Sequence, residues 1–195
     1  MFPRRTSQVQ DACVPQHKII AVYDKLAPVY DIWGALAETN ARNRALELAN
    51  VSDGSAILEL AVGTGLTFSK LVKQNLKGTN IDTLMNNYMF DLIAFKDMPD
   101  ILKEFKRVLK DDGRLILVNM TQGEAALSRV YDLIYRLSPT LMGGCREVKL
   151  TDELIASGFK VETREYIQQM LFPSEVILPG PIHSTFGVTA LYREF

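Results

Sequence analysis

The chain has 195 residues, of which 47% are hydrophobic and 23% charged, and its net charge is −1 at pH 7. This composition predicts one folded globular domain, and the balanced charge gives no indication of a nucleic-acid-binding surface. Cys13 and Cys145 lie far apart, and His17 and His183 stand alone, so the sequence indicates neither a disulfide nor a metal site. The absence of a secretory signal and of a long apolar stretch predicts a cytoplasmic protein with no transmembrane segment.

The first 50 residues predict two helices and a tyrosine-rich connection. One helix begins within 15–23, and Pro28 interrupts it because proline removes a backbone donor and clashes with the preceding turn. A second helix spans about 39–50, with alanines on one face. The connection over 23–31 reads Tyr-Asp-Lys-Leu-Ala-Pro-Val-Tyr-Asp, and it forms either an inert cover of the core or a lid over a ligand.

The next stretch predicts a ligand-binding turn. The apolar run from Ala56 to Leu60 is typical of a buried parallel strand, and a turn with Gly63 and Gly65 follows it. Such a turn, with a helix directly after it, lets backbone N–H groups approach a nucleotide-like ligand. Phe68 replaces the third glycine of the dinucleotide fingerprint, which disfavours a nicotinamide dehydrogenase.

The second half of the chain predicts alternating strands and helices. A strand over 81–85, an amphipathic helix over 98–109 and a strand over 114–120 form a βαβ unit with parallel strands. Four more elements are expected: a helix over 123–137, a short helix over 151–158, a strand over 159–167 and a final strand over 186–192. The last two strands are expected to close the sheet as an antiparallel hairpin.

Three stretches resemble class I S-adenosylmethionine-dependent methyltransferases. Glu59-x-x-x-Gly63-x-Gly65 is similar to motif I of that family, and the tyrosine-rich connection resembles the ubiquinone/menaquinone-biosynthesis type. The region from Asp82 to Leu115 is similar to the family's fourth-strand to fifth-strand region. The resemblance implies one domain over 1–195, with an N-terminal helical lid over 1–50 and a Rossmann-like α/β core over 51–195. The core sheet is expected to be mostly parallel, with the antiparallel hairpin at its C-terminal edge.

The resemblance leaves a gap after the first core helix. Only a few polar residues separate Gln74 from Ile81, where the family has its second and third strands. Asp82 is rejected as the ribose-binding acid because it fits the start of the fourth strand. We therefore expect the second and third strands to be absent from the given residues, with a break in the chain near Asn80. Without those strands, the run before Gly63 would be an unprotected sheet edge.

The resemblance also implies a function. The expected cofactor is S-adenosyl-L-methionine, and its methyl group passes to a small-molecule acceptor such as a quinone precursor or a lipid head group. The implied cofactor-binding residues are Tyr23, Glu59, Ala61, Gly63, Thr64, Gly65, Asn86 and Asn87. The substrate-side candidates are Tyr30, Tyr88, Asn119 and Arg146. No catalytic residue is assigned, because a sulfonium methyl is already activated. The alternative is a non-catalytic binding or scaffold protein, and a homodimer is left open.

Overall fold

A computed structural model describes residues 11, 14, 16–60, 81–123, 137, 145–170 and 172–180 of the chain. Five strands form one sheet in the order β1-β2-β3-β5-β4. Their bounds are β1 Ile57–Leu60, β2 Ile81–Asn87, β3 Leu109–Met120, β4 Val161–Gln169 and β5 Phe172–Pro179. The helices are α1 Gln16–Ala37, α2 Thr39–Ala49, α4 Met98–Val108 and α6 Leu150–Ala156. Two 3-10 turns, η1 Phe90–Leu92 and η2 Phe95–Asp97, precede α4.

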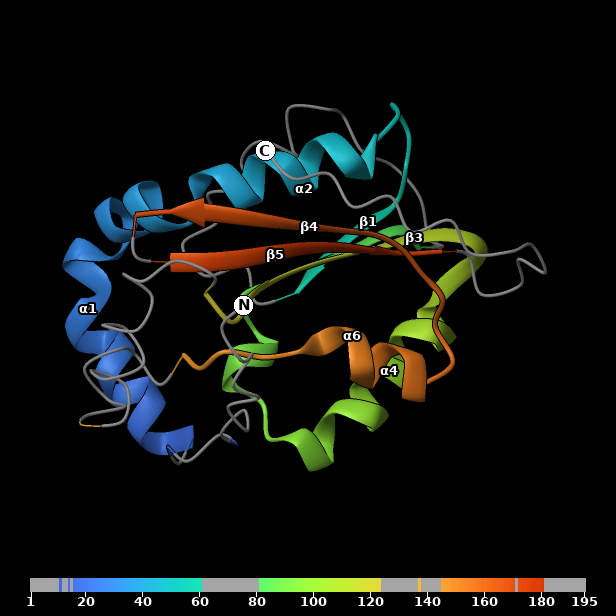
Figure 1. Ribbon diagram of the computed structural model, residues 1–195. Coiled ribbons are helices and arrows are strands. Elements are labelled where there is room, and N and C mark those ends of the chain that lie inside the picture. The colour runs from blue at the N-terminus through green and yellow to red at the C-terminus, as the bar shows by residue number, and fades with distance from the viewer. Residues whose placement is uncertain are drawn as a thin grey trace, which may run out of the picture.

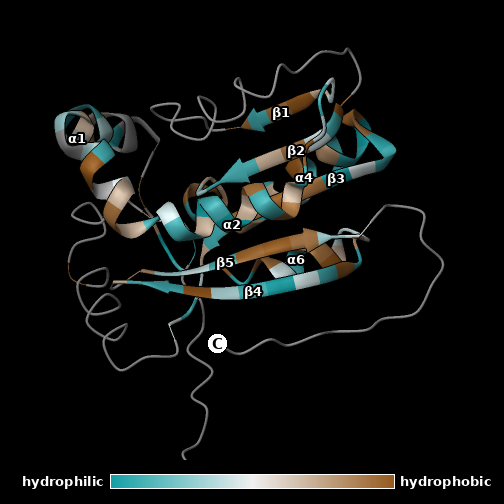
Figure 2. Ribbon diagram, turned by 90° about the horizontal axis from the view of Figure 1, so that it is seen from above, coloured by the Kyte–Doolittle hydropathy of each residue, from teal (hydrophilic) through white to brown (hydrophobic). Residues whose placement is uncertain are grey.

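The sheet is mixed. The strand β2 pairs in parallel with both β1 and β3, whereas β5 pairs antiparallel with both β3 and β4. The predicted βαβ unit is confirmed, but a mostly parallel sheet is not, because two of the four pairings are antiparallel. We call the edge at which β1, β2 and β3 end the carboxyl edge, and β5 begins there beside the end of β3 (Figures 1 and 2).

The strand β5 lies where the sequence predicts a loop. The predicted final strand over 186–192 falls outside the described residues, whereas β5 covers 172–179 and is buried at every position except Leu178. Proline is disfavoured inside a sheet because it cannot donate to the ladder. Pro173 and Pro179 lie at or next to the ends of β5, where the missing donors cost the sheet least.

The helix α1 continues through Pro28, so the predicted break is wrong. An interior proline costs a helix about 3 kcal/mol, and packing across the interruption offsets part of that cost. Tyr23 and Tyr30 lie on opposite sides of Pro28 along the helix, and their ring centroids are 5.6 Å apart. Both tyrosines are partly buried, while Pro28 is exposed. The ring contact therefore helps to hold the two halves of α1 in line.

The other helices cover the two faces of the sheet (Figure 1). The predicted alanine face of α2 is confirmed, since Ala41, Ala45 and Ala49 are buried against one sheet face. On the opposite face, α4 and α6 close the larger core, in which Phe90 and Phe105 pack edge to face. The helix α1 lies beyond the strands at the carboxyl edge in both views (Figures 1 and 2).

Asp82 has a structural role at the amino end of β2. Its carboxylate accepts hydrogen bonds from the Ala56 N–H at 2.8 Å and from the Lys110 ammonium at 2.5 Å. These contacts lie at the amino end of β2, whereas ligands of such sheets bind at the opposite end of the strands. The expected break near Asn80 and the absent strands fall within 61–80, which lie outside the described residues.

Candidate functional site

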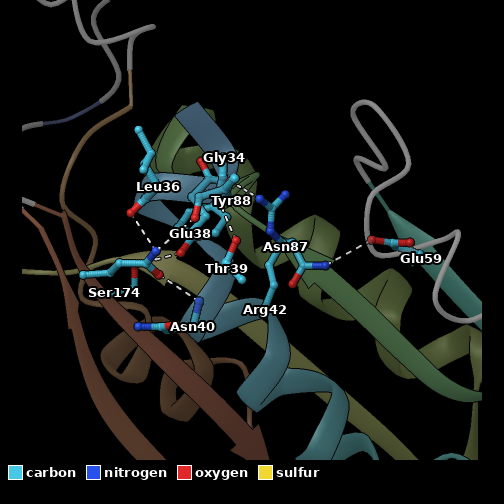
Figure 3. Close-up of polar contacts among 12 residues, drawn as sticks. Gly34, Leu36, Glu38, Thr39, Asn40, Arg42, Glu59, Asn87, Tyr88 and Ser174 are labelled. Atoms are coloured by element: carbon cyan, nitrogen blue, oxygen red, sulfur yellow. Dashed lines mark hydrogen bonds and ion pairs between the residues drawn. The ribbon is translucent and has the colours of Figure 1, made fainter. Parts of the chain in front are cut away.

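Polar side chains join the carboxyl ends of β1 and β2. The side-chain amide of Asn87 donates to Glu59 Oε1 at 3.1 Å (Figure 3). Asn86 is fully buried, and its amide nitrogen donates to the Met89 sulfur at 3.4 Å. Within the described part of the chain, the side-chain oxygens of both asparagines have no hydrogen-bond partner. The structure therefore brings Glu59 and Asn87 together, whereas Asn86, the preceding residue of the same strand, points to the opposite face of the sheet. Each asparagine leaves one buried side-chain oxygen available at the carboxyl edge.

Four other predicted cofactor-binding residues lie outside the described residues: Ala61, Gly63, Thr64 and Gly65. Their role stays a prediction from motif I. Glu59 is the second-to-last residue of β1, so the Glu59–Asn87 hydrogen bond lies at the end of the described strand.

Tyr88 turns the chain sharply after β2. Its φ of 54° lies in the left-handed region, which non-glycine residues adopt rarely and often at functional sites. Two contacts hold it there: its N–H donates to the Val118 carbonyl at 2.7 Å, and its hydroxyl is 2.8 Å from the Ser174 hydroxyl (Figure 3). Burial raises the pKa of Tyr88, so the phenol stays neutral at physiological pH.

A buried acid lies just beyond Tyr88 in the chain. Asp91 is fully buried, and the loss of solvation raises the pKa of its carboxyl from 3.8 to about 7. The charge of Glu38 raises this pKa further, while the Cys145 thiol and the Arg146 guanidinium lower it. The Tyr23 hydroxyl lies 3.4 Å from the Cys145 sulfur, and burial raises the pKa of both groups. We call Tyr23, Glu38, Asp91, Cys145 and Arg146 the Asp91 cluster.

The junction between α1 and α2 adds an ion pair to this region. Glu38 and Arg42 lie 3.4 Å apart, and each side chain is 12% exposed (Figure 3). The guanidinium of Arg42 lies against Gly34, where an added Cβ would come within 2.7 Å of it. Burial raises the pKa of Glu38, and Arg42 opposes that shift. Glycine at 34 thus gives the arginine room to neutralise Glu38.

Arg146, a predicted substrate-side residue, is 1% exposed and held by its own surroundings. Its guanidinium donates to the Ile93 carbonyl at 2.5 Å and lies 4.2 Å from the centre of the Phe95 ring. It also lies 3.7 Å from the Asp11 carboxylate. These contacts fix it beside Asp91, whose backbone carbonyl accepts from the Arg146 N–H at 3.3 Å.

Asn119, another substrate-side candidate, lies near the end of β3. It is fully buried, and within the described residues neither its side-chain oxygen nor its nitrogen has a hydrogen-bond partner. Its neighbour in the β3–β5 pairing is Glu175, which binds Arg164 at 2.6 Å. Asn119 is separated from Glu59 by the strand β2. The sequence candidates therefore divide between the β1–β2 end, the α1 side and the β3–β5 pair.

Sequence reasoning missed Asp91 and Glu38. The available signal at Asp91 was an acidic residue in an otherwise apolar run, Met-Phe-Asp-Leu, four residues after a strand end. No described helix is long and apolar enough to cross a membrane. The described residues also contain no group of three or more side chains that could hold a metal ion.

The sequence matches no protein-family model and no curated protein. The fold, however, is similar to several solved structures. One is Burkholderia thailandensis 1,6-didemethyltoxoflavin-N1-methyltransferase, crystallised with 1,6-didemethyltoxoflavin and S-adenosylhomocysteine. It aligns over 92% of this chain and 98% of its own, at 12% identity and a TM-score of 0.61.

Two further neighbours have the same kind of fold. A Thermotoga maritima S-adenosylmethionine-dependent methyltransferase, described as a possible histamine N-methyltransferase, aligns over 83% of this chain and 98% of its own, at 20% identity and a TM-score of 0.58. Geranyl diphosphate methyltransferase, in complex with GPP and sinefungin, aligns over 73% of this chain and 78% of its own, at 11% identity and a TM-score of 0.54. At such identities the similarity concerns the fold alone. The chain therefore has the class I fold of S-adenosylmethionine-dependent methyltransferases.

Proposed function

We propose that this protein transfers a methyl group from S-adenosylmethionine to a small-molecule acceptor. The observation that carries the proposal is the Asn87–Glu59 hydrogen bond, which joins the ends of β1 and β2 where motif I begins. Ligands of such α/β sheets bind outside the carboxyl ends of the strands. The fold neighbours crystallised with S-adenosylhomocysteine or sinefungin support the choice of cofactor.

The described residues fit this cofactor. Glu59, Asn86 and Asn87 would hold it, together with the glycine turn over 61–65. The buried side-chain oxygens of the two asparagines have no partner within the described residues, and the N–H groups of such a ligand would satisfy them, as buried acceptors require. When bound, S-adenosylmethionine supplies a methyl group that its positively charged sulfur already activates.

The protein's own contribution is then position and exclusion of water. The helix α1 lies over the carboxyl edge (Figures 1 and 2), and its two partly buried tyrosines, Tyr23 and Tyr30, face one another there. We assign α1 the role of the lid expected over 1–50. The acceptor classes implied by the resemblance, quinone precursors and lipid head groups, belong to the proposal.

Isothermal titration of the full chain with S-adenosylhomocysteine tests the proposal. We expect saturable binding by the natural protein, at least about tenfold weaker binding by Glu59→Gln, and none by Gly65→Val, because the added side chain would block backbone approach to the ligand. Asp53→Asn, at an exposed turn position, is the matched control and should bind normally. Thermal unfolding of each variant checks that it folds.

Two results would contradict the proposal. The absence of binding by the folded natural protein would favour the non-catalytic scaffold. Normal binding by Gly65→Val would show that the assignment of motif I is wrong.

A further inference from the structure

The Asp91 cluster contains a buried acid that the proposed cofactor site does not use. Asp91 follows β2 by four residues and is fully buried. Among the described residues, neither oxygen of its carboxylate has a well-formed hydrogen bond, although the Cys145 thiol faces it. Burying a carboxyl group is costly unless a partner satisfies it. A leucine at this position would avoid that cost, so the carboxyl group calls for a functional explanation.

The cluster lies next to the proposed cofactor site. Only Tyr88 and two further residues separate Asn87 from Asp91 in the chain, and Tyr88 is held against β3 and β5 through Val118 and Ser174. Asp91 is therefore held close in the chain to the proposed cofactor site.

The charges around Asp91 indicate what kind of molecule can bind there. Three parts of the chain contribute groups around Asp91: Tyr23 comes from α1, Glu38 from the α1–α2 junction, and Cys145 and Arg146 from the segment before α6. Tyr23 and Cys145 stay neutral because burial raises the pKa of each. Each buried acid has an arginine near it: Glu38 pairs with Arg42, and Arg146, which also lies 3.7 Å from the exposed Asp11 carboxylate, lowers the pKa of Asp91. We therefore expect a neutral molecule rather than a cation to bind there.

We propose that Asp91 is a catalytic residue that accepts the proton of a neutral methyl acceptor whose nucleophile is an O–H or N–H group. This inference rests on the proposed function. A lone pair of the acceptor's oxygen or nitrogen forms the new bond to the methyl carbon as the bond between that carbon and sulfur breaks. The sulfur keeps the bonding electrons and becomes a neutral thioether. The acceptor's proton passes to the Asp91 carboxylate and then to solvent.

The environment of Asp91 suits this role. A general base works best when its pKa is near the working pH, and burial places the pKa of Asp91 at about 7. The helix α1 reaches the same cluster through Tyr23, whose hydroxyl lies 3.4 Å from the Cys145 sulfur and whose pKa is raised by burial and, in part, by the charge of Asp91.

Binding of two probes tests the proposal without an identified acceptor. The probes are 4-fluorophenol and 4-fluoroaniline, which are both neutral between about pH 6 and pH 8 and are followed by fluorine NMR on the full chain saturated with S-adenosylhomocysteine. We expect at least one probe to bind saturably, with an affinity that rises about tenfold over this range as Asp91 loses its proton. Binding of the phenol alone identifies an O–H nucleophile, and binding of the aniline alone an N–H nucleophile.

Three variants test whether Asp91 causes the rise in probe affinity with pH. Asp91→Asn should remove the rise with pH, whereas Glu38→Gln should keep it. Asp97→Asn, an exposed acid on the same segment, should match the natural protein. For any acceptor that the enzyme turns over, Asp91→Asn should lower kcat by at least about a hundredfold, with a smaller change in KM.

The proposal is overturned if neither probe binds to protein that still binds S-adenosylhomocysteine, or if Asp91→Asn keeps the rise with pH. Failure of S-adenosylhomocysteine itself to bind would instead refute the proposed function, so the two failures are distinguishable.

Discussion

Asn87 and Glu59 are joined by a hydrogen bond between their side chains, across the ends of the parallel strands β1 and β2. The amide donates at 3.1 Å to one oxygen of the carboxylate, and both side chains lie on the sheet face that α2 covers (Figure 3). Because the register aligns Leu60 with Asn86, the two side chains meet without distortion of either strand. The position of the Glu59 carboxylate is therefore set by β2 as well as by β1, the strand that contains Glu59.

Removal of the Asn87 amide should weaken cofactor binding. Asn87→Ala leaves Glu59 without its positioning donor, and we expect the dissociation constant for S-adenosylhomocysteine to rise about tenfold, equivalent to about 1.4 kcal/mol. Isothermal titration measures the change. Asn43→Ala, at an exposed position of α2, is the control. Equal affinity in both variants would mean that Asn87 has only a local structural role.

The buried Asp91 should make stability depend on pH. Its pKa is raised from 3.8 to about 7 in the folded protein, so the folded state binds the proton more tightly than the unfolded state. The resulting stabilisation is complete below about pH 4 and is lost as the pH rises through about 7. Relative to the natural protein, Asp91→Asn should therefore gain about 3 kcal/mol between about pH 5 and pH 8. Urea unfolding at the two pH values measures the gain, and a constant difference would contradict the prediction.

The Arg164–Glu175 pair should contribute more to stability than a surface ion pair. Glu175 is fully buried, and the Arg164 guanidinium donates to it at 2.6 Å. Arg164→Ala leaves a buried carboxylate without its counter-charge, and we expect a loss of about 3 kcal/mol. Arg107→Ala breaks the exposed pair with Glu104 and should cost less than about 1 kcal/mol. Similar losses in the two variants, measured by urea unfolding, would show that burial does not distinguish the pairs.

Gln169 should limit local opening of the backbone at the junction between α1 and α2. Its side-chain nitrogen donates to the carbonyls of Ala35 and Leu36 at 3.1 and 2.6 Å, and its oxygen accepts from the Asn40 N–H at 2.8 Å (Figure 3). It thus satisfies backbone groups that both helix ends leave unpaired. Gln169→Ala should speed hydrogen exchange of the Asn40 amide and of the last turn of α1.

Gln168→Ala is the matched control for this experiment. The side chain of Gln168 bonds to Tyr166 and to the Met170 carbonyl, within its own strand and turn. Unchanged exchange at the junction in Gln169→Ala, measured by mass spectrometry, would show that the helix ends are held by other contacts.

Elements with one buried face could be predicted from the sequence. The helices α2 and α4 show helical spacing of apolar residues because one side of each packs on the sheet, and both were placed within a few residues of their observed bounds. The strand β5 shows no such pattern. It is buried on both faces, yet it contains Pro173, Ser174 and Glu175, whose partners come from β3 and β4. Those partners cannot be read from a local window of sequence.

The candidate site was predictable where it depends on strand ends. Glu59, Asn86 and Asn87 were identified because residues at the carboxyl ends of neighbouring parallel strands meet in space. Asp91 was not identified, because its burial depends on Tyr23 and Cys145, which lie 122 residues apart in the sequence. The continuity of α1 was missed for a similar reason: a local rule excluded Pro28, whereas the contact between two tyrosines offsets part of the cost of the proline.

The proline in α1 divides that helix into two parts with different attachments. Because Pro28 has no N–H, the Asp24 carbonyl lacks its usual donor within the helix. Within the described part of the chain, Gln169 fastens the part after Pro28 to β4, whereas the part before Pro28 carries Tyr23, which joins the Asp91 cluster through Cys145. A helix bends most cheaply at such a point. If α1 bends, we therefore expect it to bend at position 28, while the helix end anchored on β4 stays in place.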